Sequence, residues 1–198
     1  MVDGQVRPLG LANDAICGAF ADIPREMFTE GPSRGIAHCD TSVPAGEGRL
    51  MIAPHLLARL IDAARLSPTS SVLDVGCASG YSTAVIARVA GTAIGIEENA
   101  VLAGAASRNL DRLEIDNAAV LHAPPAGGCL AEAPFDAIII SGGEISSLPQ
   151  DLAGQLAPGG RLACVMNGLL TVATRQDDTF PENTAGHAEA PHFPLSQT

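Results

Sequence analysis

The sequence predicts an α/β protein with an open, mostly parallel, doubly wound sheet and an N-terminal helical extension. Three observations support this fold class: an apolar strand running into a glycine turn at 72–81, a second strand ending in an acid at 94–97, and alternating strand and helix patterns from Ser71 onward. Such alternation is typical of a parallel sheet with helices on both faces. The 198 residues, 46% of them hydrophobic, are enough for one substantial core.

Short apolar runs predict the strands, and segments with helical spacing between them predict the helices. Strands are expected at 72–75, 92–97, 118–122, 135–140, 161–166 and 169–174, and helices at 81–89, 100–110 and 146–156. The helix over 146–156 is expected to end at Pro158-Gly159-Gly160, because proline and glycine interrupt helices. The run at 135–140 is the most apolar and is therefore expected to be a central strand.

Three parts of one domain are expected along the chain. They are an extension over residues 1–70 with helices near 13–21 and 54–66, an α/β core over 71–175, and a C-terminal segment over 176–198. Residues 176–191 are polar and contain Pro and Gly, so we expect a mobile loop there. The following His192-Phe193-Pro194-Leu195 run is a candidate edge strand.

Charge and composition argue against several classes of partner. The net charge is −11, lysine is absent, and the 11 arginines are scattered between Arg7 and Arg175, so we expect no nucleic-acid partner. No stretch approaches the roughly 18 apolar residues of a membrane span, and the N-terminus does not resemble a secretory leader. We therefore expect a cytoplasmic protein without a membrane partner.

The five cysteines are expected to be reduced thiols. They are widely spaced and include no Cys-x-x-Cys pair that could supply half of a zinc site. His38-Cys39-Asp40 places potential ligands side by side, but no second cluster completes a site. We therefore expect no metal.

A cofactor site is expected at the glycine turn, formed by Gly76, Cys77, Ala78, Ser79 and Gly80. In open α/β sheets, ligands bind beyond the carboxyl ends of the strands, where this turn lies. Glycine lets the backbone approach a ligand without a Cβ clash, and the Ser79 hydroxyl adds a polar group.

Two acids complete the predicted cofactor site. Glu97 ends the second strand, where a carboxylate can accept hydrogen bonds from both hydroxyls of a ribose; Glu98 is the less favoured substitute. Asp74 suits a cofactor with a positively charged amino acid end and a sulfonium. Together the two acids point to S-adenosyl-L-methionine.

The glycine turn has two other interpretations. A dinucleotide motif Gly-x-Gly-x-x-Gly beginning at Gly76 would need glycine where the chain has Ala78 and Tyr81, which argues against it. The second alternative is a tight strand-to-helix turn with no ligand, beside a solvated acid at Glu97.

Blocks along almost the whole chain resemble the protein-L-isoaspartate O-methyltransferase family. They are Met1-Val2-Asp3-Gly4-Gln5-Val6, Ile23-Pro24-Arg25-Glu26-Met27-Phe28, Ala37-x-x-Asp40-x-x-x-Pro44-x-Gly46-x-Gly48, residues 72–81, Ala133-Pro134-Phe135-Asp136-Ala137-Ile138-Ile139 and Leu156-Ala157-Pro158-Gly159-Gly160-Arg161-Leu162. The resemblance implies a Rossmann-like methyltransferase core that binds S-adenosylmethionine and an acceptor-side segment within residues 1–70. It also implies the α-carboxylate of L-isoaspartyl residues in damaged proteins as the acceptor.

The chain departs from the family pattern at three places. Ile52 stands where family members carry an active-site hydroxyl, Ala123-Pro124-Pro125 replaces a Gly-Asp pair whose acid can bind adenine, and Glu144 adds a carboxylate near the expected mouth of the site. Arg49 and His55 are the donors nearest the altered segment. We therefore take Arg49, Ile52, His55 and Glu144 as acceptor-side candidates.

No catalytic residue is assigned from the sequence. A carboxylate is already ionised at neutral pH, so its methylation needs no general base, and positioning carries the rate. The departures leave two alternatives open: a relative that methylates another, unidentified acceptor, including a small one, and a non-catalytic cofactor-binding protein.

Overall fold

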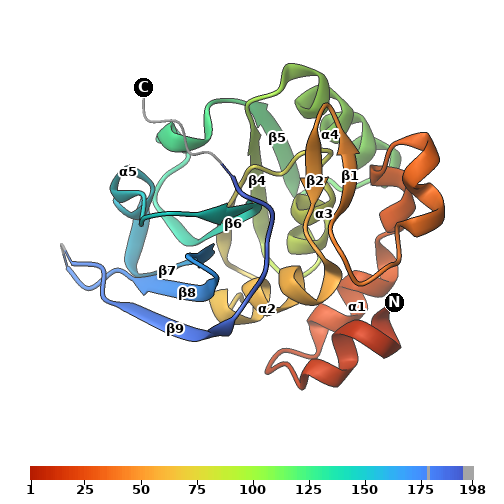
Figure 1. The fold of residues 1–198 in the computed structure, drawn as a ribbon. Helices are drawn as coiled ribbons and strands as arrows, with labels where there is room; N and C mark the ends of the chain where they lie inside the picture. The colour runs from red at the N-terminus through yellow and green to blue at the C-terminus, as the bar shows by residue number, and fades with distance from the viewer. Residues whose placement is uncertain (178, 194–198) are drawn as a thin grey trace.

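A seven-stranded sheet forms the centre of the computed structural model, which describes residues 1–177 and 179–193 (Figure 1). The strands lie in the order β5-β4-β3-β6-β7-β8-β9, parallel from β5 to β7 and antiparallel from β7 to β9. Their bounds are β3 Ser71–Val75, β4 Thr92–Glu97, β5 Ala118–His122, β6 Phe135–Ile145, β7 Leu156–Met166, β8 Leu169–Thr174 and β9 Glu182–His187. The predicted fold class, open and mostly parallel, is confirmed.

Helices cover both faces of the sheet, as predicted. The helices are α1 Ala15–Asp22, α2 Pro54–Ala64, α3 Tyr81–Ala87, α4 Ala100–Arg112 and α5 Gln150–Ala153. Side chains of α1 to α4 share one core with Val72 and Ile139, whereas α5 shares the other core with Leu73 and Ile138. Successive side chains on a strand point to opposite faces, so neighbours enter different cores.

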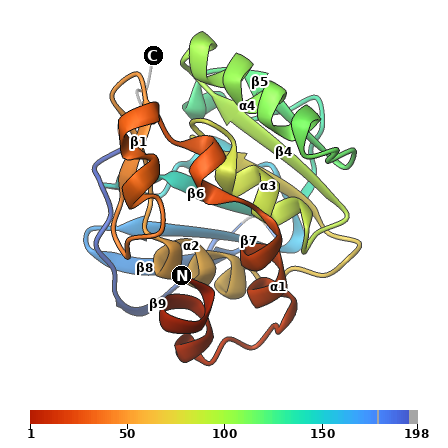
Figure 2. The ribbon, with the colours of Figure 1, turned by 90° about the vertical axis from the view of Figure 1, so that its right-hand side faces the viewer.

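The N-terminal extension packs against the side of the sheet that carries α2 and α3, nearest to the viewer in Figure 2. Besides α1 and α2 it contains short turns of helix and a β1–β2 hairpin. Their bounds are η1 Val2–Val6, η2 Arg7–Leu9, η3 Arg25–Phe28, η4 Gly31–Ile36, β1 Val43–Gly46 and β2 Arg49–Met51; a further short turn, η5, spans Pro125–Gly127.

The helix predicted over residues 146–156 is wrong at both ends. The residue before a proline is disfavoured in helical conformation, and α5 begins only after Pro149. Its last residue is Ala153, because Gln155 turns away to accept from the backbone N–H of Cys129 at 2.8 Å and to donate to the carbonyl of Gly127 at 2.9 Å. The Pro158-Gly159-Gly160 segment therefore lies within β7 and does not end a helix.

A strand occupies part of the segment predicted to be a mobile loop. β9 pairs antiparallel with β8 and forms one edge of the sheet, where exposed polar residues are typical. Residues 188–193, which we call the strap, then cross to β6, where His192 forms a bridge with Glu144. The predicted position of His192 at a sheet edge is therefore wrong, because His192 pairs with the interior strand β6. Pro194 and Leu195 lie outside the described residues.

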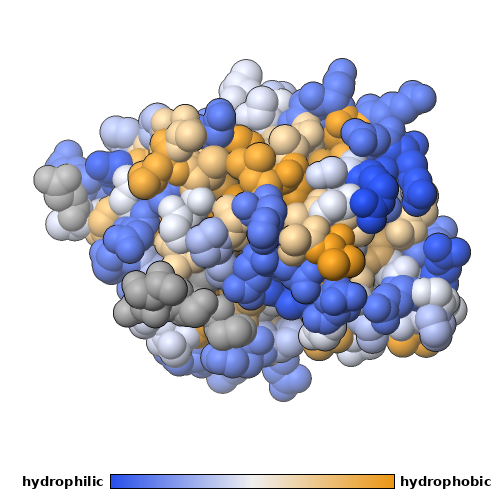
Figure 3. Space-filling view, turned by 90° about the horizontal axis from the view of Figure 1, so that it is seen from above, coloured by the Kyte–Doolittle hydropathy of each residue, from blue (hydrophilic) through white to orange (hydrophobic). Residues whose placement is uncertain are grey.

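The surface mixes polar and apolar areas. Seen from above in Figure 3, apolar side chains gather across the middle of the molecule and polar ones toward its right side. The large apolar side chains exposed among the described residues are Ile36, Val101, Leu121 and Leu130. Within residues 1–177 and 179–193, no helix has the length and apolar character needed to cross a membrane.

Candidate active site

The glycine turn joins β3 to α3 in conformations that favour glycine. Gly76 and Gly80 have φ values of +79° and +92°. A Cβ on Gly80 would lie 2.8 Å from the Cβ of Ala106 on α4, and a Cβ on Gly76 would lie 2.6 Å from the ring of Phe193. The two glycines thus accommodate neighbouring parts of the chain, whereas the sequence analysis assigned them only to ligand approach.

Asp74 is fully buried directly before the turn and binds three hydroxyls. Its carboxylate accepts hydrogen bonds from Ser82 at 2.6 Å, Thr83 at 2.7 Å and Ser141 at 2.5 Å. Burial raises the pKa of Asp74, and the three hydroxyls oppose this rise. Asp74 therefore ties β3, α3 and β6 together, while its contact with a cofactor stays a prediction.

Glu97 lies at the end of β4, 1% exposed, with its carboxylate turned toward the glycine turn. One oxygen accepts the backbone N–H of Ala78 at 2.8 Å, and the other accepts that of Asn99 at 3.0 Å. The acid thus lies against the turn, while its contact with a ribose stays a prediction. The structure excludes the alternative of a solvated strand end.

Two other residues of the turn, Ser79 and Cys77, are buried. The hydroxyl of Ser79 donates to the carbonyl of Phe28 at 2.6 Å and so ties the turn to the N-terminal extension. Burial raises the pKa of the Cys77 thiol well above its ordinary value and keeps it neutral. Backbone atoms of these residues remain the groups that could face a cofactor.

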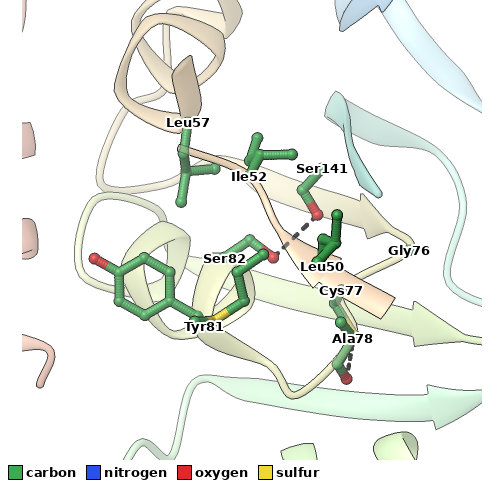
Figure 4. Close-up of a pocket in the computed structure, with 10 residues that line it drawn as sticks. Leu50, Ile52, Leu57, Gly76, Cys77, Ala78, Tyr81, Ser82 and Ser141 are labelled. Atoms are coloured by element: carbon green, nitrogen blue, oxygen red, sulfur yellow. Dashed lines mark hydrogen bonds between the residues drawn. The ribbon is translucent and has the colours of Figure 1, made fainter. Parts of the chain in front are cut away.

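A small cavity of about 10 Å³ lies beside the turn (Figure 4). Apolar side chains of the N-terminal extension, Leu50, Ile52 and Leu57, line it from one side, while Gly76, Cys77, Ala78, Tyr81, Ser82 and Ser141 line it from the other. The hydroxyls of Ser82 and Ser141 lie 3.0 Å apart at its polar side. The cavity brings Ile52 next to the turn, while its contact with an acceptor stays a prediction.

Arg49 lies beside the glycine turn, and its side chain is 15% exposed. Its guanidinium is 3.5 Å from the carboxylate of Glu97 and 3.3 Å from that of Glu98, and it donates to the carbonyl of Gly76 at 3.3 Å. It also stacks over the ring of Phe193, 4.6 Å from the ring centre. Of the acceptor-side candidates, Arg49 contacts the predicted cofactor residues most directly.

The other two polar candidates lie away from the small cavity. His55 pairs with Asp40 at 2.6 Å, in an open surface depression of about 730 Å³ that Leu50 also lines. The Glu144 carboxylate accepts the backbone N–H of Gly168 at 2.8 Å, between β7 and β8. Glu144 is therefore turned toward that connection and not toward the mouth of the site, which corrects the sequence prediction.

Sequence reasoning missed two residues that shape the site. Arg25 is fully buried, donates to the carbonyls of Ala37 and Ile52 at 2.8 Å each, and lies over the ring of Tyr81. The Pro-Arg-Glu block was a signal for Arg25, but it was used only as a family marker. Phe193 had no comparable signal, because its contact with the turn depends on the path of the strap.

This fold, with a glycine turn after β3 and an acid at the end of β4, defines the class of Rossmann-like methyltransferases. A family model described as Protein-L-isoaspartate(D-aspartate) O-methyltransferase matches residues 4–185. The chain therefore belongs to the protein-L-isoaspartate O-methyltransferase family, whose class is that of the S-adenosylmethionine-dependent carboxyl methyltransferases. The family expected from the sequence is thus confirmed.

Curated relatives support this membership, and solved structures share the fold. Protein-L-isoaspartate O-methyltransferases of Syntrophus aciditrophicus and Aliivibrio fischeri (strain MJ11) are 37% and 36% identical, over 85% and 92% of this chain and 77% and 89% of their own lengths. A solved protein-L-isoaspartate O-methyltransferase superposes with a TM-score of 0.84 at 22% identity, over 100% of this chain and 66% of that one. A Plasmodium falciparum protein assigned to the family, solved with S-adenosyl-L-homocysteine, gives 0.76 at 24% identity, over 94% and 93%.

Proposed function

We propose that the chain transfers the methyl group of S-adenosylmethionine to the α-carboxylate of L-isoaspartyl residues in damaged proteins. The observation that carries the site assignment is the contact between Glu97 and the glycine turn, supported by the family membership. Glu97 would accept the ribose hydroxyls, and the backbone of residues 76–80 would lie along the cofactor. Asp74 would not touch the cofactor but would hold the turn in place through its three hydrogen bonds to hydroxyls of α3 and β6.

The residues at the turn fit this cofactor in shape and chemistry. Gly76 and Gly142 face each other so closely that a Cβ on Gly76 would lie 2.8 Å from the Cα of Gly142. Such a surface without side chains, on which the Phe193 ring lies here, suits close approach by a ligand once that ring is displaced, and the acid Glu97 suits the ligand's hydroxyl groups. When bound, S-adenosylmethionine supplies a methyl group on a positively charged sulfur.

The chain's own part in the reaction is positioning and exclusion of water. The acceptor carboxylate is ionised at neutral pH and is itself the nucleophile, so no side chain has to remove a proton. Leu50, Ile52 and Leu57 provide an apolar wall beside the turn, which would strip water from that carboxylate. Correct orientation of two reacting groups can by itself contribute several orders of magnitude in rate.

The acceptor polypeptide would bind at the surface depression next to the site. Leu50 lines both the small cavity and this depression, so a peptide lying there would be adjacent to the reaction site. The depression is also lined by His55, which pairs with Asp40, and by Arg59, which donates to the carbonyl of His187 at 3.0 Å. An isoaspartyl protein or peptide is thus the proposed partner.

A pair of matched peptides tests this function. Methyl transfer is measured from labelled S-adenosylmethionine to a peptide with one L-isoaspartyl residue and to the same peptide with ordinary aspartate. We expect transfer to the first peptide alone. Equal labelling of both peptides, or of neither, would contradict isoaspartyl specificity.

A second candidate is methyl transfer to a different acceptor. The observation that favours it is Ile52, which is 3% exposed and places an alkyl group where the family carries a hydroxyl. Binding of S-adenosylmethionine without transfer to the isoaspartyl peptide would favour this candidate. Screening neutral and cationic small acceptors with the same labelled donor would then identify the substrate class.

We also propose that the protein works in the cytoplasm. All five cysteines are described, and all are free, as is typical of a reducing compartment. Fractionation of cells that express the tagged chain tests this location. Recovery outside the cytoplasmic fraction would contradict it.

A further inference from the structure

Arg49 and Phe193 meet over the part of the site where the proposed cofactor would lie. Arg49 comes from β2 and Phe193 from the strap, about 140 residues later in the chain. The guanidinium lies between the Phe193 ring and the carboxylates of Glu97 and Glu98, at the distances given above. One side chain thus links the acid proposed to bind ribose to the strap.

Phe193 covers the glycine turn. It is 2% exposed, and a Cβ added to Gly76 or Gly142 would lie 2.6 to 2.8 Å from its ring. Backbone hydrogen bonds hold the strap in this place: Glu144 N–H donates to the carbonyl of Pro191 at 2.6 Å, and Phe193 N–H donates to that of Glu144 at 2.8 Å. In Figure 1 the strap is the dark-blue segment that rises after β9, between β6 and the β1–β2 hairpin.

This arrangement leaves little room for a ligand. The side chain of Glu97 is fully buried, and the Phe193 ring lies directly against Gly76 and Gly142. S-adenosylmethionine can therefore contact Glu97 and these glycines only if the side chains that cover them, Arg49 and Phe193, move.

We infer that Arg49 and Phe193 form a latch that closes the cofactor site and must open before S-adenosylmethionine binds. This inference rests on the proposed function and concerns the regulation of the same site. Because only open molecules bind the cofactor, the apparent affinity equals the affinity of the open state multiplied by the fraction of molecules that are open. Arg49 holds it through a largely buried ion pair and a cation–π contact, each of which favours the closed state modestly.

Binding of S-adenosyl-L-homocysteine to four proteins tests the latch. They are the wild type, Arg49→Gln, Phe193→Leu and Arg88→Gln, the last a control on an exposed arginine of the α3 end. S-adenosyl-L-homocysteine lacks the sulfonium charge, so removing Arg49 does not simply strengthen attraction to a cation. We expect affinity to rise about 5- to 30-fold in Arg49→Gln and Phe193→Leu and to stay unchanged in Arg88→Gln.

Salt provides an independent test of the Arg49 contact. The side chain of Glu98 is 39% exposed, so added salt screens its pair with Arg49 more than it screens the buried pair with Glu97; this should weaken the latch, and wild-type affinity should rise with ionic strength. The affinity of Arg49→Gln should not rise. A salt response that is the same in both proteins, or an affinity that falls in Arg49→Gln, would overturn the inference.

Hydrogen exchange separates failure of the latch from failure of the proposed function. Without any ligand, the amides of Glu144 and Phe193 should exchange faster in Arg49→Gln than in the wild type and in Arg88→Gln. Unchanged exchange would show that Arg49 does not hold the strap. If no variant binds S-adenosyl-L-homocysteine, the proposed function fails, and the exchange rates still decide whether the latch exists.

Discussion

Glu97 combines deep burial with one carboxylate oxygen that lies near Arg49. Because the hydrogen bonds proposed to form with ribose need this charge, Glu97→Gln should weaken S-adenosylmethionine binding by about 1–3 kcal/mol when it is added to Arg49→Gln, in which the ion pairs of the latch are already absent. Calorimetric titration measures the change, and thermal unfolding checks that the variant folds. Glu98→Gln in the same Arg49→Gln protein is the matched control and should bind within about twofold of Arg49→Gln alone. Unaltered affinity on adding Glu97→Gln would mean that the ribose lies elsewhere.

Tyr81, the only tyrosine of the chain, offers a direct optical test of burial beside Arg25. Burial raises its pKa to about 12, against an ordinary value of about 10, while the Arg25 charge acts in the opposite direction. The protonated Tyr81 therefore contributes to the stability of the folded protein relative to the unfolded protein. This contribution is fully present below about pH 10 and is lost as the pH rises through about 12. Ultraviolet titration of tyrosinate in native and urea-unfolded protein should show this difference; equal values would contradict the packing.

Ile52 decides between the two acceptor candidates. If only the hydroxyl is missing, Ile52→Ser should raise kcat/KM for the isoaspartyl peptide about 10-fold or more, because an orienting donor can contribute about 10² to 10³ in rate. Ile52→Val keeps the apolar character and serves as the control. If the Ile52→Ser protein binds the cofactor but transfers the methyl group no faster than the wild type, the result would favour a different acceptor.

At the scale of elements, Arg25 connects η3, the β1–β2 region and α3. Its guanidinium donates hydrogen bonds to the carbonyls of Ala37 and Ile52. The ammonium group of a lysine cannot donate to both carbonyls in the same geometry. Arg25→Lys should therefore lower the free energy of unfolding by about 2–4 kcal/mol in urea denaturation. The exposed Arg34→Lys should change it by less than about 0.5 kcal/mol. Equal stabilities of the two variants would contradict this role.

Elements with a strong local pattern could be predicted from the sequence, and those fixed by distant contacts could not. The strands at 92–97, 118–122 and 169–174 have the predicted bounds. α5 is shorter than predicted because Gln155 is recruited by the loop at Gly127 and Cys129, which no local pattern reveals. β9 has a polar sequence, and only pairing with β8 makes it a strand.

The same distinction applies to the site. The positions of Glu97 and the glycine turn follow from the β3-α3-β4 pattern, and both were predicted. The contact of Arg49 with these residues could not be predicted, because it depends on how the β1–β2 hairpin folds back over the sheet. The position of Phe193 likewise depends on contacts between residues far apart in sequence.

Over the whole molecule, segments that are far apart in the sequence converge on one site. The N-terminal extension supplies Arg49 and the apolar wall, the α/β core supplies the turn and Glu97, and the strap supplies Phe193. Isoaspartyl methyl transfer would require all three parts to be folded together. The chain is strongly acidic, with a net charge of −11, and this charge argues against a polyanionic partner.

The most direct measurement is a single titration in which labelled S-adenosylmethionine is mixed with the protein and an isoaspartyl peptide, and bound donor and peptide methyl ester are both quantified. A methyl ester releases methanol in mild base, which distinguishes it from methylated nitrogen. We predict saturable donor binding and a base-labile ester on the isoaspartyl peptide, both diminished when Glu97→Gln is added to Arg49→Gln. Donor binding with no ester would contradict the isoaspartyl assignment, and absence of donor binding would contradict the cofactor site itself.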